Sequence, residues 1–249
     1  MPDPMPHLTP ERPPLLLLAA TAMELAAFLR HTSLAMYSVT PPTAGQSILK
    51  DTCVLAACGV GPVNAALAAG RLLERHAPRG VILVGIAGSF DTVRHPLGSV
   101  RLVVEEIWPE YGIAGARGVH ARALGFPQAE IHGEPVWDRL AWDAMADASA
   151  LGVNPSHIPA ARGLTVAGVT GTPRRAAAMA RRFQPDLEHM EGFPVALACR
   201  LAGVAFVQLR SVSNPVGVRD KRAWDIPGAL AALAETGRDL GRSGLFSEG

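Results

Sequence analysis

The chain has 249 residues, a formal net charge of +1 and 49% hydrophobic residues, which suits one large domain with a substantial buried core. No cluster of Lys and Arg is long enough to follow a phosphate backbone, so we expect no nucleic-acid partner. Cys53, Cys58 and Cys199 lie in apolar runs, which argues against disulfides and against a metal site. No apolar run approaches the ~18 residues of a membrane span. We therefore expect a cytoplasmic protein without membrane contact, metal or cofactor.

The chain opens with a proline-rich segment, residues 1–14, which predicts a loose tail before a single domain at 15–249. Short apolar runs then recur and do not alternate with polar residues, as is typical of strands buried on both faces. These runs are 15–20, 53–58, 81–86, 100–104, 164–169 and 204–209. Helical patterns lie between several of them, at 62–76, 176–183 and 194–201. Alternating strands and helices predict an α/β sheet with helices on both faces.

Two segments depart from this alternation. Residues 106–160 are rich in Gly, Pro, Trp and polar residues, with one helical pattern near 136–150, and we interpret them as an excursion from the domain. Residues 222–240 predict a terminal helix pair broken at Pro227 and Gly228.

Glycine-rich turns follow two of the predicted strands, at 58–62 and 85–90. The first can bring backbone N–H groups to an anion at a helix N-terminus, or it can be no more than a tight strand-to-helix turn. It is not the dinucleotide fingerprint, because Asn64 stands where the third glycine would be. The second turn can build a ligand crevice at the strand ends or can serve close packing.

Polar residues follow the later strands. Val169 and Thr170 lie in a turn that can present main-chain groups to a flat heterocycle. Glu191 precedes a helix, where it can accept hydrogen bonds from a ribose diol or can interact with the helix dipole. Asn214 ends the last strand and can bind a 6-oxopurine, although Asn-Pro is also an ordinary turn signal.

These motifs, in this order, resemble the nucleoside phosphorylase/nucleosidase superfamily over about residues 15–235. The resemblance is carried by residues 59–66, 85–90, 188–192 and 210–214. Residues 216–220 and 223–227 are similar to the C-terminal signature of the futalosine hydrolase family of menaquinone biosynthesis. The resemblance implies a twisted mixed sheet, a homodimer or larger homo-oligomer, and hydrolysis of the N-glycosidic bond of a hypoxanthine nucleoside.

The resemblance also implies roles for particular residues. Glu191 would hold the ribose hydroxyls, Asn214 would stabilise the leaving hypoxanthine, and Glu24 would activate water. The substrate-binding residues would be Met190, Phe90, Val169, Thr170, Gly88 and Ser213. In related methylthioadenosine nucleosidases an Asp stands at the position of Asn214 and suits a 6-amino base.

One departure from the superfamily pattern concerns the activator of water. Related nucleosidases carry a Glu three residues after a position like Met23, but here Ala26 stands there and Glu24 comes two residues earlier. Either Glu24 takes this role through a shifted turn, or another group does, or the water needs little activation. The alternative functions are a purine nucleoside phosphorylase, which the missing Glu favours, a methylthioadenosine/S-adenosylhomocysteine-type nucleosidase, and a nucleoside-binding protein without turnover. A dinucleotide-binding oxidoreductase is disfavoured by the incomplete glycine pattern.

Overall fold

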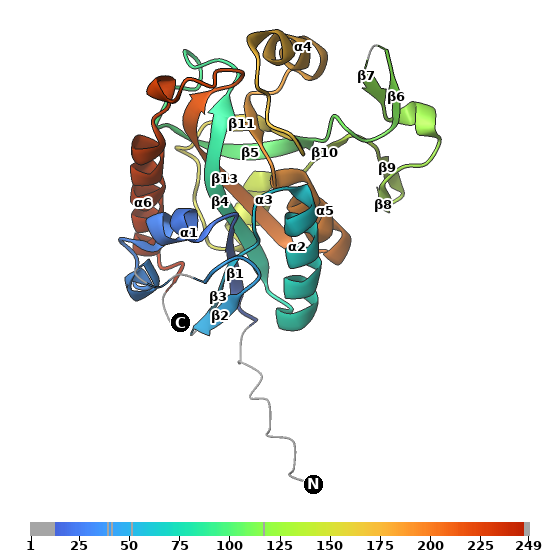
Figure 1. Ribbon diagram of the computed structural model, residues 1–249. Helices are drawn as coiled ribbons and strands as arrows, with labels where there is room; N and C mark the ends of the chain where they lie inside the picture. The colour runs from blue at the N-terminus through green and yellow to red at the C-terminus, as the bar shows by residue number, and fades with distance from the viewer. Residues whose placement is uncertain (1–12, 39, 41, 51, 117, 247–249) are drawn as a thin grey trace.

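The centre of the fold is a nine-stranded mixed sheet, whose strands come from most parts of the chain that the structure describes (Figure 1). The computed structural model describes residues 13–246 except 39, 41, 51 and 117. The strands are β1 Leu15–Ala19, β2 Ser47–Lys50, β3 Cys53–Ala57, β4 Gly80–Ser89, β5 Val100–Ile107, β6 Ile113–Gly115, β7 Gly118–His120, β8 Ala129–Ile131, β9 Glu134–Val136, β10 Arg139–Ala141, β11 Ala160–Thr165, β12 Leu187–His189 and β13 Ala205–Pro215. The α-helices are α1 Ala22–Leu29, α2 Pro62–His76, α3 Ala144–Ala150, α4 Pro173–Phe183, α5 Gly192–Ala202 and α6 Ile226–Arg242.

The sheet has an open half and a closed half. In the open half, β4, β1 and β3 run parallel and β2 adds an antiparallel edge. In the closed half, β4 pairs with β13, β13 with β5, β5 with β11, β11 with β12, and β12 with β4 again. These five strands, which we call the ring, each contribute one residue to a single apolar cluster made of Ala87, Val103, Ala161, Leu187 and Val212. Closure removes the exposed edges that an open sheet would leave.

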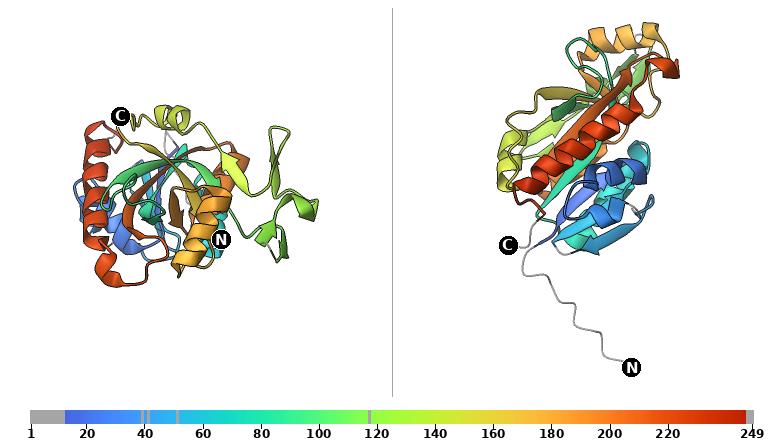
Figure 2. Two further views of the ribbon diagram at one scale, coloured as in Figure 1. Left: turned by 90° about the horizontal axis from the view of Figure 1, so that it is seen from above. Right: turned by 90° about the vertical axis from the view of Figure 1, so that its left-hand side faces the viewer.

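Helices cover both faces of the sheet because successive side chains of a strand point to opposite sides. Leu15 and Leu17 of β1 belong to a core shared with α1 and α6, whereas Leu16 and Leu18 belong to a core shared with α2 and α5. All four side chains are fully buried. Figure 2 shows α1 and α6 stacked along one side of the sheet. The expectation of an α/β fold with helices on both faces is confirmed.

The excursion forms an arm beside the domain. The hairpins β6–β7 and β8–β9 project away from the sheet, and α3 returns the chain to the core (Figures 1 and 2). The helical pattern expected at 136–150 was therefore only partly right, because its first residues lie in β9 and β10 and the helix begins at Ala144. Gly133 and Pro135, just before this pattern, favour a hairpin over a helix.

The helix expected at 62–76 is found with the same bounds, and other expected elements are found with altered ones. The strand expected at 164–169 ends at Thr165 and begins earlier, at Ala160. The expected break at Pro227 and Gly228 was wrong. A short 3-10 helix, Lys221–Ala223, precedes one continuous helix that begins at Ile226, and Pro227 fits the first turn of that helix, where a missing N–H costs nothing. Helix α1 and strand β12 were not anticipated. Apart from Pro13 and Pro14, the tail expected at 1–14 lies outside the described residues.

Candidate functional site

A cavity of about 270 Å³ opens where several strands end. The parallel strands β1, β3, β4 and β13 point their carboxyl ends the same way, which is where open α/β sheets bind ligands. The lining consists of Ala20, Thr21, Met23, Glu24, Val60, Ile86, Ala87, Gly88, Val169, Thr170, Glu188, His189, Met190, Glu191, Ser213, Asn214, Val218, Arg219 and Trp224. A larger hollow of about 640 Å³ between β2, β3 and α2 has no acidic residue in its lining. The smaller cavity therefore contains the candidate chemistry.

Glu191 lies directly before α5 and is only 4% exposed. Three hydrogen-bond donors hold its carboxylate. Its Oε1 accepts a hydrogen bond from the Gly61 N–H (3.1 Å), and its Oε2 accepts from Met190 N–H (3.3 Å) and the Arg210 guanidinium (3.4 Å). Gly61 has a φ of 98°, a conformation that other residues adopt only with strain. The glycine-rich turn at 58–62 thus presents its N–H to an anion, and that anion is a carboxylate of the protein itself.

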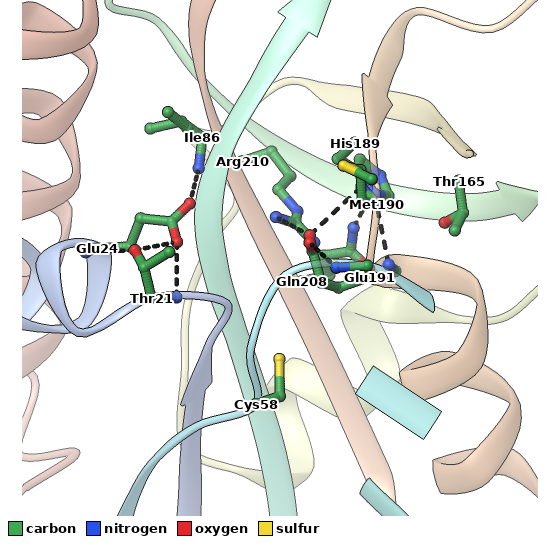
Figure 3. Close-up of polar contacts among 12 residues, drawn as sticks. Thr21, Glu24, Cys58, Ile86, Thr165, His189, Met190, Glu191, Gln208 and Arg210 are labelled. Carbon is green, nitrogen blue, oxygen red and sulfur yellow. Dashed lines mark hydrogen bonds and ion pairs between the residues drawn. The ribbon is translucent and has the colours of Figure 1, made fainter. Parts of the chain in front are cut away.

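Arg210 is the largest fully buried side chain and comes from the middle of β13. One Nη atom donates to Glu191, while Nε and the other Nη make no hydrogen bond to the described residues. A Cβ on Gly85 would lie 2.5 Å from Arg210 Nη1 and 2.9 Å from Glu24 Oε1. Gly85 therefore leaves the space in which Arg210 and Glu24 approach each other, and this guanidinium lies near both carboxylates (Figure 3).

Glu24 occupies the N-terminal turn of α1 and points across to β4. Its Oε2 accepts from the backbone N–H (3.0 Å) and hydroxyl (2.6 Å) of Thr21, and its Oε1 accepts from Ile86 N–H (3.0 Å). Burial raises the pKa of Glu24 despite these hydrogen bonds and the nearby Arg210. Thr21 and Glu24 form a capping box, a signal present in the sequence that explains why Glu24 and not Ala26 faces the cavity.

Asn214 lies at an irregularity of β13. The register between β13 and β4 shifts between Val212 and Asn214, so that Asn214 pairs with Gly88 and Ser213 is the extra residue. Ser213 Oγ donates to Asn214 Oδ1 (2.8 Å), and Asn214 Nδ2 donates to Pro215 O (3.1 Å). One lone pair of the amide oxygen and one amide N–H remain for a ligand. A Cβ on Gly88 would lie 3.2 Å from Asn214 Nδ2, so glycine gives this amide its room.

The remaining expected residues occupy two places. Met190, Val169, Thr170, Gly88 and Ser213 line the cavity with the three polar groups already described. Phe90 is not among the lining residues and packs in an apolar cluster beside Met190. The structure thus brings together every expected site residue except Phe90.

Glu188 adds a third carboxylate to the cavity wall. Its two oxygens accept from the N–H (2.9 Å) and hydroxyl (2.5 Å) of Thr170, and burial raises the pKa of this carboxyl group. The N–H and hydroxyl of Thr170 were expected to face a heterocycle. They bind the carboxylate of Glu188 instead. The sequence contains Glu188 beside the expected motif, but nothing in its spacing separates it from a solvated residue.

A buried polar cluster inside the ring supports the turn that carries Glu191. Glu106 Oε1 lies 3.0 Å from His189 Nε2 and accepts from Gln208 Nε2 (2.9 Å), and Glu106 Oε2 accepts from the Thr165 hydroxyl (2.7 Å). His189 Nδ1 accepts from Gly192 N–H (3.4 Å), and its Nε2 also lies 3.2 Å from Gln208 Nε2. The cluster therefore ties four strands of the ring to the residues on either side of Glu191.

Cations are scarce in this cavity. Arg219 is the only Lys or Arg among the lining residues, and its guanidinium carbon lies 5.0 Å from the centroid of the Trp224 ring. Among the described residues we find no cluster of three or more His, Cys, Asp or Glu arranged to hold a metal ion. No helix in the described part of the chain is both long and apolar enough to cross a membrane.

The chain belongs to the phosphorylase superfamily, whose family model matches residues 14–240. It is 37% identical over 183 residues to a futalosine hydrolase of Thermus thermophilus, covering 73% of this chain and 78% of the relative. It is 36% identical over 228 residues to a futalosine hydrolase of Streptomyces coelicolor, covering 89% and 92%. These relatives hydrolyse N-glycosidic bonds, and the expected superfamily is confirmed.

The fold is also found in solved structures. A 5′-methylthioadenosine/S-adenosylhomocysteine nucleosidase of Colwellia psychrerythraea, solved in complex with adenine, superposes with a TM-score of 0.67 at 20% identity. The match covers 96% of this chain and 97% of the nucleosidase. At this identity the match establishes the fold, and the substrate must be argued from the site.

Proposed function

We propose that this protein hydrolyses the N-glycosidic bond of futalosine, releasing hypoxanthine and dehypoxanthine futalosine. The observation that carries the proposal is the convergence of Glu24, Glu191 and Asn214 on one cavity, in a chain whose relatives include futalosine hydrolases. Water adds to the anomeric carbon as the bond to the base nitrogen breaks. The water gives up one proton to the general base, and the leaving base takes up one proton, so that hypoxanthine departs neutral and the two protons balance.

Glu191 is suited to bind the ribose. A carboxylate can accept hydrogen bonds from two vicinal hydroxyls, and Gly61 and Arg210 hold this one in a fixed position. The negative charge also stabilises the positive charge that develops on the sugar as the bond breaks. Met190 lies next to it in the chain and can pack on the apolar face of the sugar.

Asn214 is suited to a 6-oxopurine. The free lone pair of its carbonyl oxygen can accept from N7–H of the departing base, and its free N–H can donate to O6. A 6-amino base would place its own N–H donors opposite the N–H of Asn214. Two donors cannot form a hydrogen bond, and leaving them buried without partners is costly. The hydrogen bonds of the amide to Ser213 and Pro215 support this proposed orientation.

Glu24 is suited to activate the water. Its pKa is raised by burial, and a general base works best when its pKa is near the working pH. The water would lie between Glu24 and Arg210, whose Nε and second Nη have donors to spare. General-base catalysis of this kind contributes typically 10²–10⁴-fold.

A phosphorylase is the second candidate, favoured by those same donors of Arg210, because a buried guanidinium with free N–H groups can also bind phosphate. Against it, Glu24 and Glu191 lie near this guanidinium and would repel a dianion. The test is to incubate the protein with futalosine, inosine and methylthioadenosine, with and without phosphate, and to measure free base. Release of hypoxanthine from futalosine without phosphate is expected; release that requires phosphate would establish the phosphorylase.

A further inference from the structure

The charges of the cavity are unevenly distributed. Glu24, Glu188 and Glu191 supply three carboxylates to its wall, and each is at most 7% exposed. Arg219 is the single cationic side chain of the lining and is exposed, which places it at the mouth. Arg210 lies behind Glu24 and Glu191 and is fully buried, so Arg219 is the cation that an incoming ligand can reach. An anionic group of the ligand is therefore attracted to the side of the mouth where Arg219 lies.

Arg219 has a stacking partner and no ion-pair partner. Its guanidinium lies over the Trp224 ring, and no carboxylate of the described residues lies within 4.0 Å of it. The neighbouring cation is different: Arg222 donates to both oxygens of Asp220, with a shortest distance of 2.6 Å. Arginine stacked on an aromatic ring keeps its N–H edge free for a planar anion such as a carboxylate.

The segment that carries Arg219 is anchored at several points. Trp224 Nε1 donates to Val218 O (2.9 Å), and the N–H of Asp225 donates to Ser213 O (2.7 Å). A Cβ on Gly217 would lie 2.8 Å from Thr172 O, so the backbone here is packed closely against the start of α4. Stacking on a fixed Trp224 therefore lowers the entropy that Arg219 must lose when it binds an anion.

We propose that Arg219, held on Trp224, binds the carboxylate of the benzoate that futalosine carries on its 5′ side, and so selects anionic aryl nucleosides over neutral ones. The inference rests on the proposed function, because it assumes that the ribose lies on Glu191 with its base toward Asn214. The 5′ substituent then extends toward the mouth, away from the three carboxylates.

The experiment compares futalosine with its methyl ester, which has nearly the same size and no charge. Hydrolysis of both is measured for the wild type, Arg219→Met, Arg219→Lys and the control Arg222→Met. Met retains an apolar stem of similar length and removes the charge. Arg222 is a matched control because it is an exposed cation of the same segment already paired with Asp220.

Arg219→Met should lower kcat/KM for futalosine roughly 10- to 100-fold, mainly through KM, as expected for loss of a charge-assisted hydrogen bond. Hydrolysis of the ester should not change. Arg219→Lys should recover part of the loss, because it restores the charge without the planar fork. Added salt should raise KM for futalosine in the wild type and have little effect in Arg219→Met.

Two other results are informative. If the wild type hydrolyses futalosine and Arg219→Met changes acid and ester alike, or changes neither, the inference is overturned and the proposed function stands. If the wild type releases no hypoxanthine from futalosine, the proposed function fails and the inference fails with it. Unchanged melting temperatures exclude misfolding as the cause of any loss.

Discussion

The N–H of Gly61 donates to the carboxylate of Glu191 across 130 residues of chain, at 3.1 Å. The contact joins the turn after β3 to the start of α5, and Arg210 binds the same carboxylate from β13. Glu191 is thus held by a turn and a strand that lie outside its own helix. A binding group that other elements hold by hydrogen bonds keeps a fixed position and orientation.

We expect Glu191→Gln to lose about tenfold more activity than Glu24→Gln. Glu191→Gln removes the charge that the ribose and Arg210 share, with each charged hydrogen bond worth about 1.5–3 kcal/mol. Glu24→Gln removes only general-base help, a loss of about 10²-fold. Single-turnover release of hypoxanthine from futalosine measures both. Equal losses, or normal turnover of both variants, would refute the assigned roles.

The pH dependence of kcat should report Glu24. Its pKa is raised, and a general base acts only when deprotonated, so kcat should fall as the pH drops through this raised pKa. The midpoint should lie above the range of an ordinary carboxyl group. Glu24→Gln should abolish this acid limb, because no titrating group remains at that position. A variant that keeps the limb would assign the base to another residue.

Asn214→Asp should lower turnover of the hypoxanthine substrate and shift preference toward its 6-amino analogue. A protonated Asp can donate to N7 and its carbonyl can accept from a 6-amino group, whereas Asn offers the opposite pattern to O6. The two substrates are mixed in one reaction, and the two bases are separated by chromatography. An unchanged ratio of bases would contradict the role of Asn214.

Gly192→Ala should be strongly destabilising and should reduce activity. A Cβ there would lie against Glu106 Oε1 and within 2.4 Å of His189 Cε1, so the buried cluster must shift and move Glu191 with it. Overpacking of this kind costs about 1–3 kcal/mol. The matched control is Gly70→Ala, where no atom lies within 4 Å and Ala favours the helix by about 1 kcal/mol. Thermal unfolding and hydrolysis are measured for both; a fully stable and active Gly192→Ala would show that the cluster is not tightly packed.

The inner strands of the open half, β1 and β3, follow directly from the sequence, whereas its edge strand β2 was not predicted. The runs that contain Leu15–Ala19 and Cys53–Ala57 are apolar throughout because both faces of these strands are buried. Pro62 begins α2 because its fixed φ suits the first helical position. Gly203 ends α5 because it adopts a left-handed φ of 65°. Signals of this kind are contained within a few residues and can be read without the structure.

The closed half could not be read in this way. Closure of the ring depends on the pairing of β12 with β4 and of β13 with β5, and these contacts join segments that are distant in the chain. The importance of Arg210 depends on closure as well, because a cation in an apolar run suggests an exposed strand end. The family pattern alone does not assign Glu24 a role, because the expected position is occupied by Ala26, whereas the capping box with Thr21 indicates the direction of the Glu24 side chain.

The extra residue of β13 has a consequence for how substrate preference can change. Regular alternation would send Ser213 and Asn214 to opposite faces of the strand, whereas the register shift lets both line the cavity. The hydroxyl of Ser213 can therefore orient its neighbour's amide. Loss of one codon at this position would leave Asn214 in the protein but without its orienting hydroxyl. Base selectivity at this strand end is thus encoded by residue count as well as by residue type.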